Sequence, residues 1–127
     1  MMKRYDPLVT PDPGEWQAID EQERIDLVVD YHRRARIRLP NLKVHAAIHA
    51  VIETQIALGE ETPVERTVRR LMSEGLDRHD AIHAAGSVLA EFIYDVRNGR
   101  VPDDADPNEV YYAELERQTA EKWRRSG

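Results

Sequence analysis

The chain has 127 residues, of which 41% are hydrophobic and 33% charged, a mixture typical of one folded domain and not of a disordered chain. It has no cysteine, which excludes disulfides, thiolate metal sites and a cysteine nucleophile and is consistent with a cytoplasmic location. The net charge of −6 disfavours nucleic-acid binding, which depends on neutralising phosphates. Because no segment resembles a signal peptide or a membrane span of roughly 20 apolar residues, we expect no membrane partner.

Start and stop signals recur along the chain and predict helices throughout, with no strand. Residues that cap a helix N-terminus precede the predicted helices, and Gly59, Gly75 and Gly99 stand where helices end. The predicted helices cover residues 20–36, 42–58, 63–74, 78–98 and 107–124, and a short turn near 13–19 holds Trp16. Because the loops are short, we expect an all-α, single-domain bundle of about five helices with up-down connections.

The last part of the chain differs in composition from the rest. Residues 101–107 are rich in aspartate and proline, and the helix that follows is highly charged. Its few apolar positions are Val110, Tyr111, Leu115 and Trp123. We therefore expect a helical core domain with an N-terminal extension over residues 1–99, and an acidic linker with a charged C-terminal helix over residues 100–127. That helix is expected to pack on a second copy of the chain, forming a homodimer, or to be partly mobile.

Two predicted helices each carry a pair of histidines four residues apart. His45 and His49 lie on the helix at 42–58, and His79 and His83 lie on the helix at 78–98. Residues at this spacing share one face of a helix, with β-carbons about 5–6 Å apart. Two imidazoles so placed can reach one metal ion, because metal–nitrogen bonds are about 2.0–2.1 Å long. The two pairs together would supply four nitrogen ligands.

An up-down topology would bring these histidines to one end of the bundle. The second and fourth elements would run parallel, with His45 and His79 in or near their first turns. His32 ends the preceding antiparallel helix and would fall at the same end. Helix N-termini are positive and disfavour a protonated imidazole, and the neutral ring is the form that binds metals.

Glu53 is the natural additional ligand, because it lies four residues from His49 on an apolar, buried helix. It is eight residues, about 12 Å, from His45, so these two cannot easily share one ion. One ion would use the four histidines, or His49 and Glu53 with the second pair, whereas two ions could use all five residues. Nitrogen ligands without thiolates favour Zn, Fe or Ni.

The alternative interpretation is a hydrogen-bonded polar core without metal. A buried acid needs a partner, and Glu53 could accept hydrogen bonds from His49 or from an arginine. The chain would then be a non-catalytic interaction or dimerisation module. The sequence leaves open whether the protein is an enzyme.

Several motifs match known sites only in part. Residues 79–83, His-Asp-Ala-Ile-His, resemble the zincin motif but carry Asp in place of the catalytic Glu. The histidine pattern is similar to part of the hemerythrin pattern, but no histidine follows His83 to match the later ligands of that family. His79-Asp80 also resembles the doublet of HD-type phosphohydrolases, whose folds are generally larger. The basic run Arg33–Arg38 indicates either cations at a helix C-terminus or a site for an anion or an acidic partner.

Two segments carry a family resemblance. Residues 42–57, LKVHAAIHAVIETQIA, and residues 74–94, EGLDRHDAIHAAGSVLAEFIY, resemble a bacterial family of uncharacterised proteins, the domain of unknown function DUF1841. That family likewise pairs H-x3-H and a Glu-x-Gln-[Ile/Val]-Ala step with a later helix that contains histidine. The resemblance implies that the histidines recur as a set, and it brings no known activity.

Overall fold

The computed structural model describes residues 2–126, within which all regular structure is helical. The all-α prediction is therefore confirmed. The described residues form seven α-helices and one 3-10 helix, so the predicted count of about five helices and the up-down connections are not confirmed. Contacts divide the chain into two compact units, Met1–Glu65 and Arg66–Gly127. Among the described helices, none combines the length and apolar character needed to cross a membrane.

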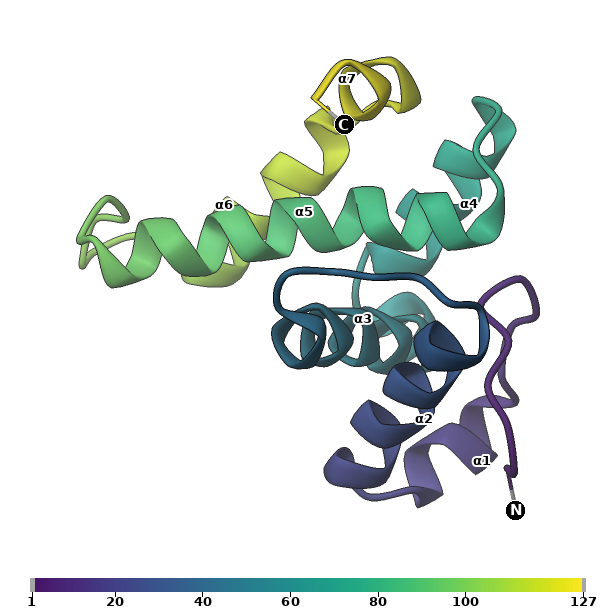
Figure 1. Ribbon diagram of the computed structural model, residues 1–127. Helices are drawn as coiled ribbons and strands as arrows, with labels where there is room; N and C mark the ends of the chain where they lie inside the picture. Colours follow the sequence, from purple (N-terminus) through teal and green to yellow (C-terminus); the bar gives the residue numbers. More distant parts are fainter. Residues whose placement is uncertain (1, 127) are drawn as a thin grey trace. The chain divides into compact units, whose positions relative to one another are not determined.

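Three α-helices and a 3-10 turn make up the first unit (Figure 1). They are α1 (Pro13–Ala18), α2 (Glu21–Arg34), α3 (Leu42–Ala57) and η1 (Gly59–Glu61). Each α-helix begins after a side chain that accepts a hydrogen bond from the backbone three residues on, and these caps are Asp12, Asp20 and Asn41. The predicted turn near residues 13–19 is the helix α1, because Asp12 caps it and Pro13 fixes φ at its first position.

The core of the first unit is built around Trp16 of α1, which is fully buried. Val28 of α2, Ala46 and Ala50 of α3, and Tyr5 from the N-terminal segment complete the buried cluster. α3 packs against both α1 and α2, and its small alanines allow this close approach. Truncating a buried Trp to alanine costs about 3–5 kcal/mol, so Trp16 is a principal anchor of the unit.

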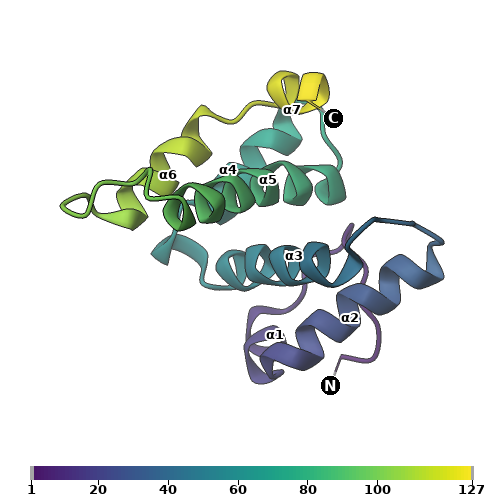
Figure 2. The ribbon, with the colours of Figure 1, turned by 60° about the vertical axis from the view of Figure 1, so that its left-hand side comes forward.

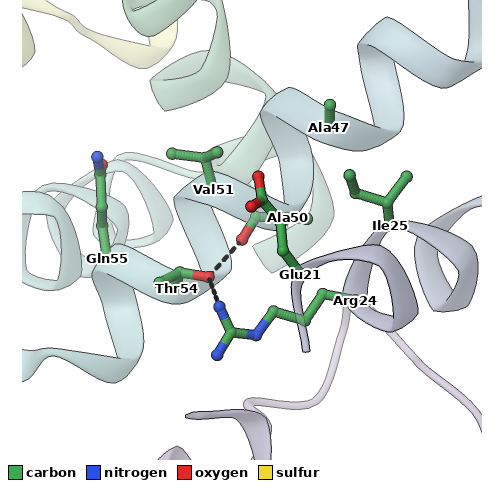
Figure 3. Close-up of a pocket in the computed structure, with 8 residues that line it drawn as sticks. All are labelled: Glu21, Arg24, Ile25, Ala47, Ala50, Val51, Thr54 and Gln55. Carbon is green, nitrogen blue, oxygen red and sulfur yellow. Dashed lines mark hydrogen bonds between the residues drawn. The ribbon is translucent and has the colours of Figure 1, made fainter. Parts of the chain in front are cut away.

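Thr54 connects the three helices through its hydroxyl group, and Figure 3 shows its bonds to Arg24 and Ala50. Its Oγ1 accepts hydrogen bonds from Trp16 Nε1 at 3.1 Å and Arg24 Nη1 at 3.3 Å, and donates to the carbonyl of Ala50 at 3.0 Å. Arg24 also donates to the carbonyls of Trp16 and Gln17, both at 3.0 Å. Arg24 and Thr54, together with apolar side chains, line a pocket of about 240 Å³ beside these bonds.

The second unit contains most of α4 and all of the helices that follow. These helices are α4 (Val64–Ser73), α5 (Arg78–Arg97), α6 (Pro107–Arg117) and α7 (Ala120–Ser126). α5 packs against α6 and α7, and Figure 2 shows α6 beside it. Phe92 of α5 stacks on Tyr111 of α6 with ring centroids 5.5 Å apart, and Leu115 is fully buried.

The predicted C-terminal helix over residues 107–124 is wrong as one element, because the chain breaks between α6 and α7. Gln118 has extended backbone angles, and its side chain donates to the carbonyl of Ala84 on α5 at 3.0 Å. Thr119 then caps the next helix by accepting from Lys122 N at 3.0 Å. These long-range and capping contacts replace the hydrogen bonds that a continuous helix would make.

The compact units meet in the sequence between Glu65 and Arg66, at the start of α4. The predicted division into a core over residues 1–99 and a tail over residues 100–127 stays a prediction.

Candidate metal centre

Three histidines of the first unit gather where α2 ends and α3 begins. His32 lies in the last turn of α2 and is fully buried, His45 lies in the first turn of α3, and His49 lies one turn further on. The ring centroids are 4.9 Å apart for His32 and His45, 5.7 Å for His32 and His49, and 6.2 Å for His45 and His49. All three pairs of rings are close to perpendicular.

The ring nitrogens of these residues are near enough to share an ion. One nitrogen from each of His32, His45 and His49 lies within 4.8 Å of those of the other two. Nitrogens bound to one tetrahedral zinc at about 2.0–2.1 Å are about 3.3 Å apart. An ion bound by all three residues would hold their nitrogens at about this separation.

The loop between α2 and α3 explains this convergence. The amide of Ile37 donates to the carbonyl of His32 at 2.9 Å, and the amide of Arg36 donates to the carbonyl of Arg33 at 3.1 Å. This pair of bonds is the Schellman motif that ends a helix and turns the chain. Asn41 then starts α3 by accepting from the amide of Val44 at 3.2 Å. The turn thus returns the first residues of α3 to the last turn of α2.

The backbone of α2 sets the tautomer of His32. Its Nδ1 lies 2.8 Å from the carbonyl oxygen of Val28. A carbonyl oxygen can only accept, so Nδ1 donates and the lone pair of the neutral ring is on Nε2. Such a hydrogen bond commonly fixes the orientation of a metal-binding imidazole and selects the nitrogen that binds.

A hydrogen-bonded chain of buried side chains does the same for His49. Tyr5 donates its phenolic proton to Glu53 Oε2, and its oxygen lies 2.7 Å from Nε2 of His49. The phenol has one proton, which it uses in the hydrogen bond to Glu53. Nε2 of His49 must therefore donate the hydrogen bond to the Tyr5 oxygen. The lone pair of His49 is then on Nδ1. Tyr5, His49 and Glu53 are all at most 2% exposed.

His45 is held in its neutral form. Burial, and then the neighbouring His32, lower the pKa of His45 below its ordinary value of 6.5. At neutral pH the ring therefore carries a lone pair, which is the state that binds a metal ion.

The second unit carries the other predicted pair. His79 and His83 lie in the first two turns of α5, half-buried, with ring centroids 4.1 Å apart. Asp77 caps this helix by accepting from the amide of Asp80 at 2.8 Å. Burial and the nearby Asp77 raise the pKa of the Asp80 carboxyl, whereas Arg124 opposes the rise. Because His79 and His83 are four residues apart, their rings lie on one face of α5, as the sequence predicts.

The five predicted site residues therefore fall into two groups. His45, His49 and Glu53 belong to the first unit, and His79 and His83 belong to the second. His32, which the sequence places at the same end as the pairs, joins His45 and His49 in the structure.

Tyr5 is the residue that sequence reasoning did not single out. It lies 44 residues before His49, in a segment without helical periodicity. Its role depends on how the N-terminal segment packs against α3, which no local pattern reveals.

Comparisons with protein-family models, with curated proteins and with solved structures give no match for this chain.

Proposed function

We propose that this protein binds a transition-metal ion through His32, His45 and His49. The observation that carries the proposal is the gathering of three ring nitrogens within 4.8 Å of one another. The hydrogen bonds from His32 to Val28 and from His49 to Tyr5 orient two of the rings. Three nitrogen ligands suit Zn, Fe or Ni, and a chain without thiolates disfavours Cu(I).

Glu53 and Tyr5 form the outer shell of the proposed site. A carboxylate that accepts a hydrogen bond in the outer shell of a ligating histidine increases the basicity of that ligand and fixes its orientation. In this chain the carboxylate acts on His49 through the Tyr5 phenol. We therefore assign Glu53 a positioning role, in place of the direct ligation that the sequence predicts.

The prediction that His79 and His83 are ligands of the same ion stays a prediction. Three protein ligands leave a fourth position, which water fills in catalytic zinc sites and a protein group fills in structural ones. The double variant His79→Asn/His83→Asn separates these cases. A loss of metal affinity confirms the second pair as ligands, whereas an unchanged affinity limits the ligands to the first unit.

Elemental analysis tests the central proposal directly. The full chain is purified without a nickel column or a chelator, and the metal content is measured before and after titration with Zn²⁺. We expect about one ion per chain, because a preformed site of three imidazoles should hold zinc tightly. Less than about 0.2 ion per chain with no uptake on titration would overturn it and favour the polar-core alternative.

Single substitutions test which residues bind the metal ion. His32→Asn and His45→Asn each remove one ligand and should reduce zinc uptake. Tyr94→Phe provides a control with an exposed phenol in the second unit and should leave uptake unchanged. Thermal unfolding of each variant in EDTA shows whether the metal-free fold is intact.

Dimerisation through the last helix remains the alternative function. Tyr111 and Leu115, two of the apolar positions assigned to a partner, are buried in the structure at 4% and 0% exposure. Light scattering on the full chain decides the oligomeric state, and a monomer at all concentrations would contradict the dimer.

Membership of the DUF1841 family is likewise a proposal, which predicts that relatives share the residues at positions 45, 49, 79 and 83.

A further inference from the structure

Three arginines surround one surface pocket in the loop that joins α2 to α3. The pocket has a volume of about 660 Å³ and is lined by Arg33, Arg36, Ile37, Arg38, Leu39 and Leu42. Within residues 2–126, no ion pair involves these arginines, and no carboxylate lines the pocket. Positive charge is thus concentrated beside apolar side chains, in a chain of net charge −6.

The helix dipole accounts for only part of this cluster. Cations in the last turn of a helix interact favourably with its dipole, which explains Arg33 and its neighbour Arg34. Arg34 also pairs with Asp30 at 2.8 Å. Arg36 and Arg38 lie beyond the end of α2, where the dipole effect has fallen off. Their charges therefore need another explanation.

Arg36 occupies the left-handed position of the motif that ends α2, where glycine is the usual residue. Arg36 has φ of 58° and is the single non-glycine residue with positive φ in the part of the chain that the structure describes. The equivalent positions after α4 and α5 are Gly75 and Gly99, which adopt this conformation without steric cost. A side chain in the left-handed region costs about 1–2 kcal/mol. Arg36 thus lines the pocket from a backbone position where the other two helices carry glycine.

We propose that this pocket binds a phosphate monoester that carries an apolar group. Guanidinium groups recognise phosphate through paired, charge-assisted hydrogen bonds, and three of them supply enough positive charge to neutralise a dianion. Ile37, Leu39 and Leu42 offer apolar contacts to the rest of the ligand. The pocket begins one residue after His32 and ends three residues before His45, so the ligand binds at the end of the α2–α3 pair that carries these histidines.

Calorimetric titration of the full chain with phenyl phosphate tests the proposal. The titration is done in EDTA, so that its result does not depend on whether the protein binds a metal. We expect saturable binding of phenyl phosphate, weaker binding of inorganic phosphate, and no binding of phenol. Arg36→Gln and Arg38→Gln should each weaken binding about tenfold or more, because each removes a charge-assisted hydrogen bond. Arg97→Gln, which removes an exposed arginine at the end of α5, is the matched control and should have no effect.

Three outcomes would overturn the proposal. The first is no saturable binding of phenyl phosphate up to about 10 mM, a limit set by the affinity of a minimal specific site. The second is an equal loss of binding in Arg97→Gln and Arg36→Gln, which would indicate attraction by overall charge alone. The third is binding of an acidic peptide under conditions where phenyl phosphate does not bind, which would assign the surface to a protein partner.

Discussion

Tyr5 donates a hydrogen bond to Glu53 and contacts His49 through the same oxygen atom. The sequence indicated a buried acid that needs a partner, and it offered His49 or an arginine for that role. The structure places a phenol between the acid and the histidine. A tyrosine is suited to this position because its hydroxyl group both donates and accepts. The tautomer of His49, a proposed ligand, thus depends on Tyr5, which is far from it in the sequence.

Replacing Tyr5 with Phe should break this connection while preserving the packing of the ring. We expect the zinc affinity to fall about 10-fold or more, as for other outer-shell partners of ligating histidines. Competition with a fluorescent chelator measures the change. Tyr94→Phe is the control, and equal affinities for the two variants would contradict the role of Tyr5.

The strain at Arg36 predicts an effect on stability. Arg36→Gly removes a side chain from the left-handed region, so the free energy of unfolding should rise by up to about 1 kcal/mol. Urea denaturation measures this value. Ala35→Gly is the matched control, because Ala35 has ordinary right-handed angles. Its free energy of unfolding should fall by about 0.5–1 kcal/mol, since glycine makes the unfolded chain more flexible. A lower free energy of unfolding in both variants would contradict this prediction and show that contacts of the Arg36 side chain outweigh the backbone strain.

At the scale of elements, α6 and α7 show how tertiary contacts divide a helix. The charged sequence over residues 107–124 is compatible with one continuous helix, and no glycine or internal proline interrupts it. The break follows from the bond of Gln118 to α5 and from the bond of Ala120 N to Glu74 Oε1 at 2.9 Å. Glu74 also pairs with Arg70 of α4 at 2.7 Å, so it connects α4 to the first residue of α7.

Glu74 therefore makes a testable contribution to the second unit. Glu74→Ala should lower the free energy of unfolding by about 1 kcal/mol at pH 7, as does loss of a helix cap. Glu116→Gln is the control, because its pair with Arg66 is exposed and such pairs contribute about 0–1 kcal/mol. Urea denaturation of both variants checks the difference, and equal losses would contradict the capping role.

The contribution of Glu74 should also depend on pH. The backbone bond from Ala120, and then Arg70, lower the pKa of Glu74 below its ordinary value of 4.5. Between the pKa of Glu74 in the folded chain and 4.5, the unfolded chain therefore binds more protons than the folded chain. The stabilisation that Glu74 provides is full above pH 4.5 and is lost as the pH falls through its pKa in the folded chain. The stability difference between the wild type and Glu74→Gln should shrink with acidification, and a difference that grows in acid would contradict this assignment.

At the scale of the whole molecule, the chain forms two compact units, and the proposed ligands His32, His45 and His49 lie in the first. A ligand that binds only the native state stabilises it by about 2.7 kcal/mol at 100 times its Kd. Hydrogen exchange should therefore show slower opening of α2 and α3 when zinc is added. Unchanged exchange in these helices, in a chain that takes up zinc, would contradict ligation by the first unit.

The sequence by itself determined the helical character of the chain, most helix bounds and the pairing of His45 with His49 and of His79 with His83. These features depend on caps, glycines and spacings of four residues, all of which act within a few residues. The tertiary structure decided the contact of Tyr5 with Glu53, the meeting of His32 with His45, and the break at Gln118. Each of these depends on how a loop or an extended segment returns to a distant helix, and that path is set by packing across the whole unit.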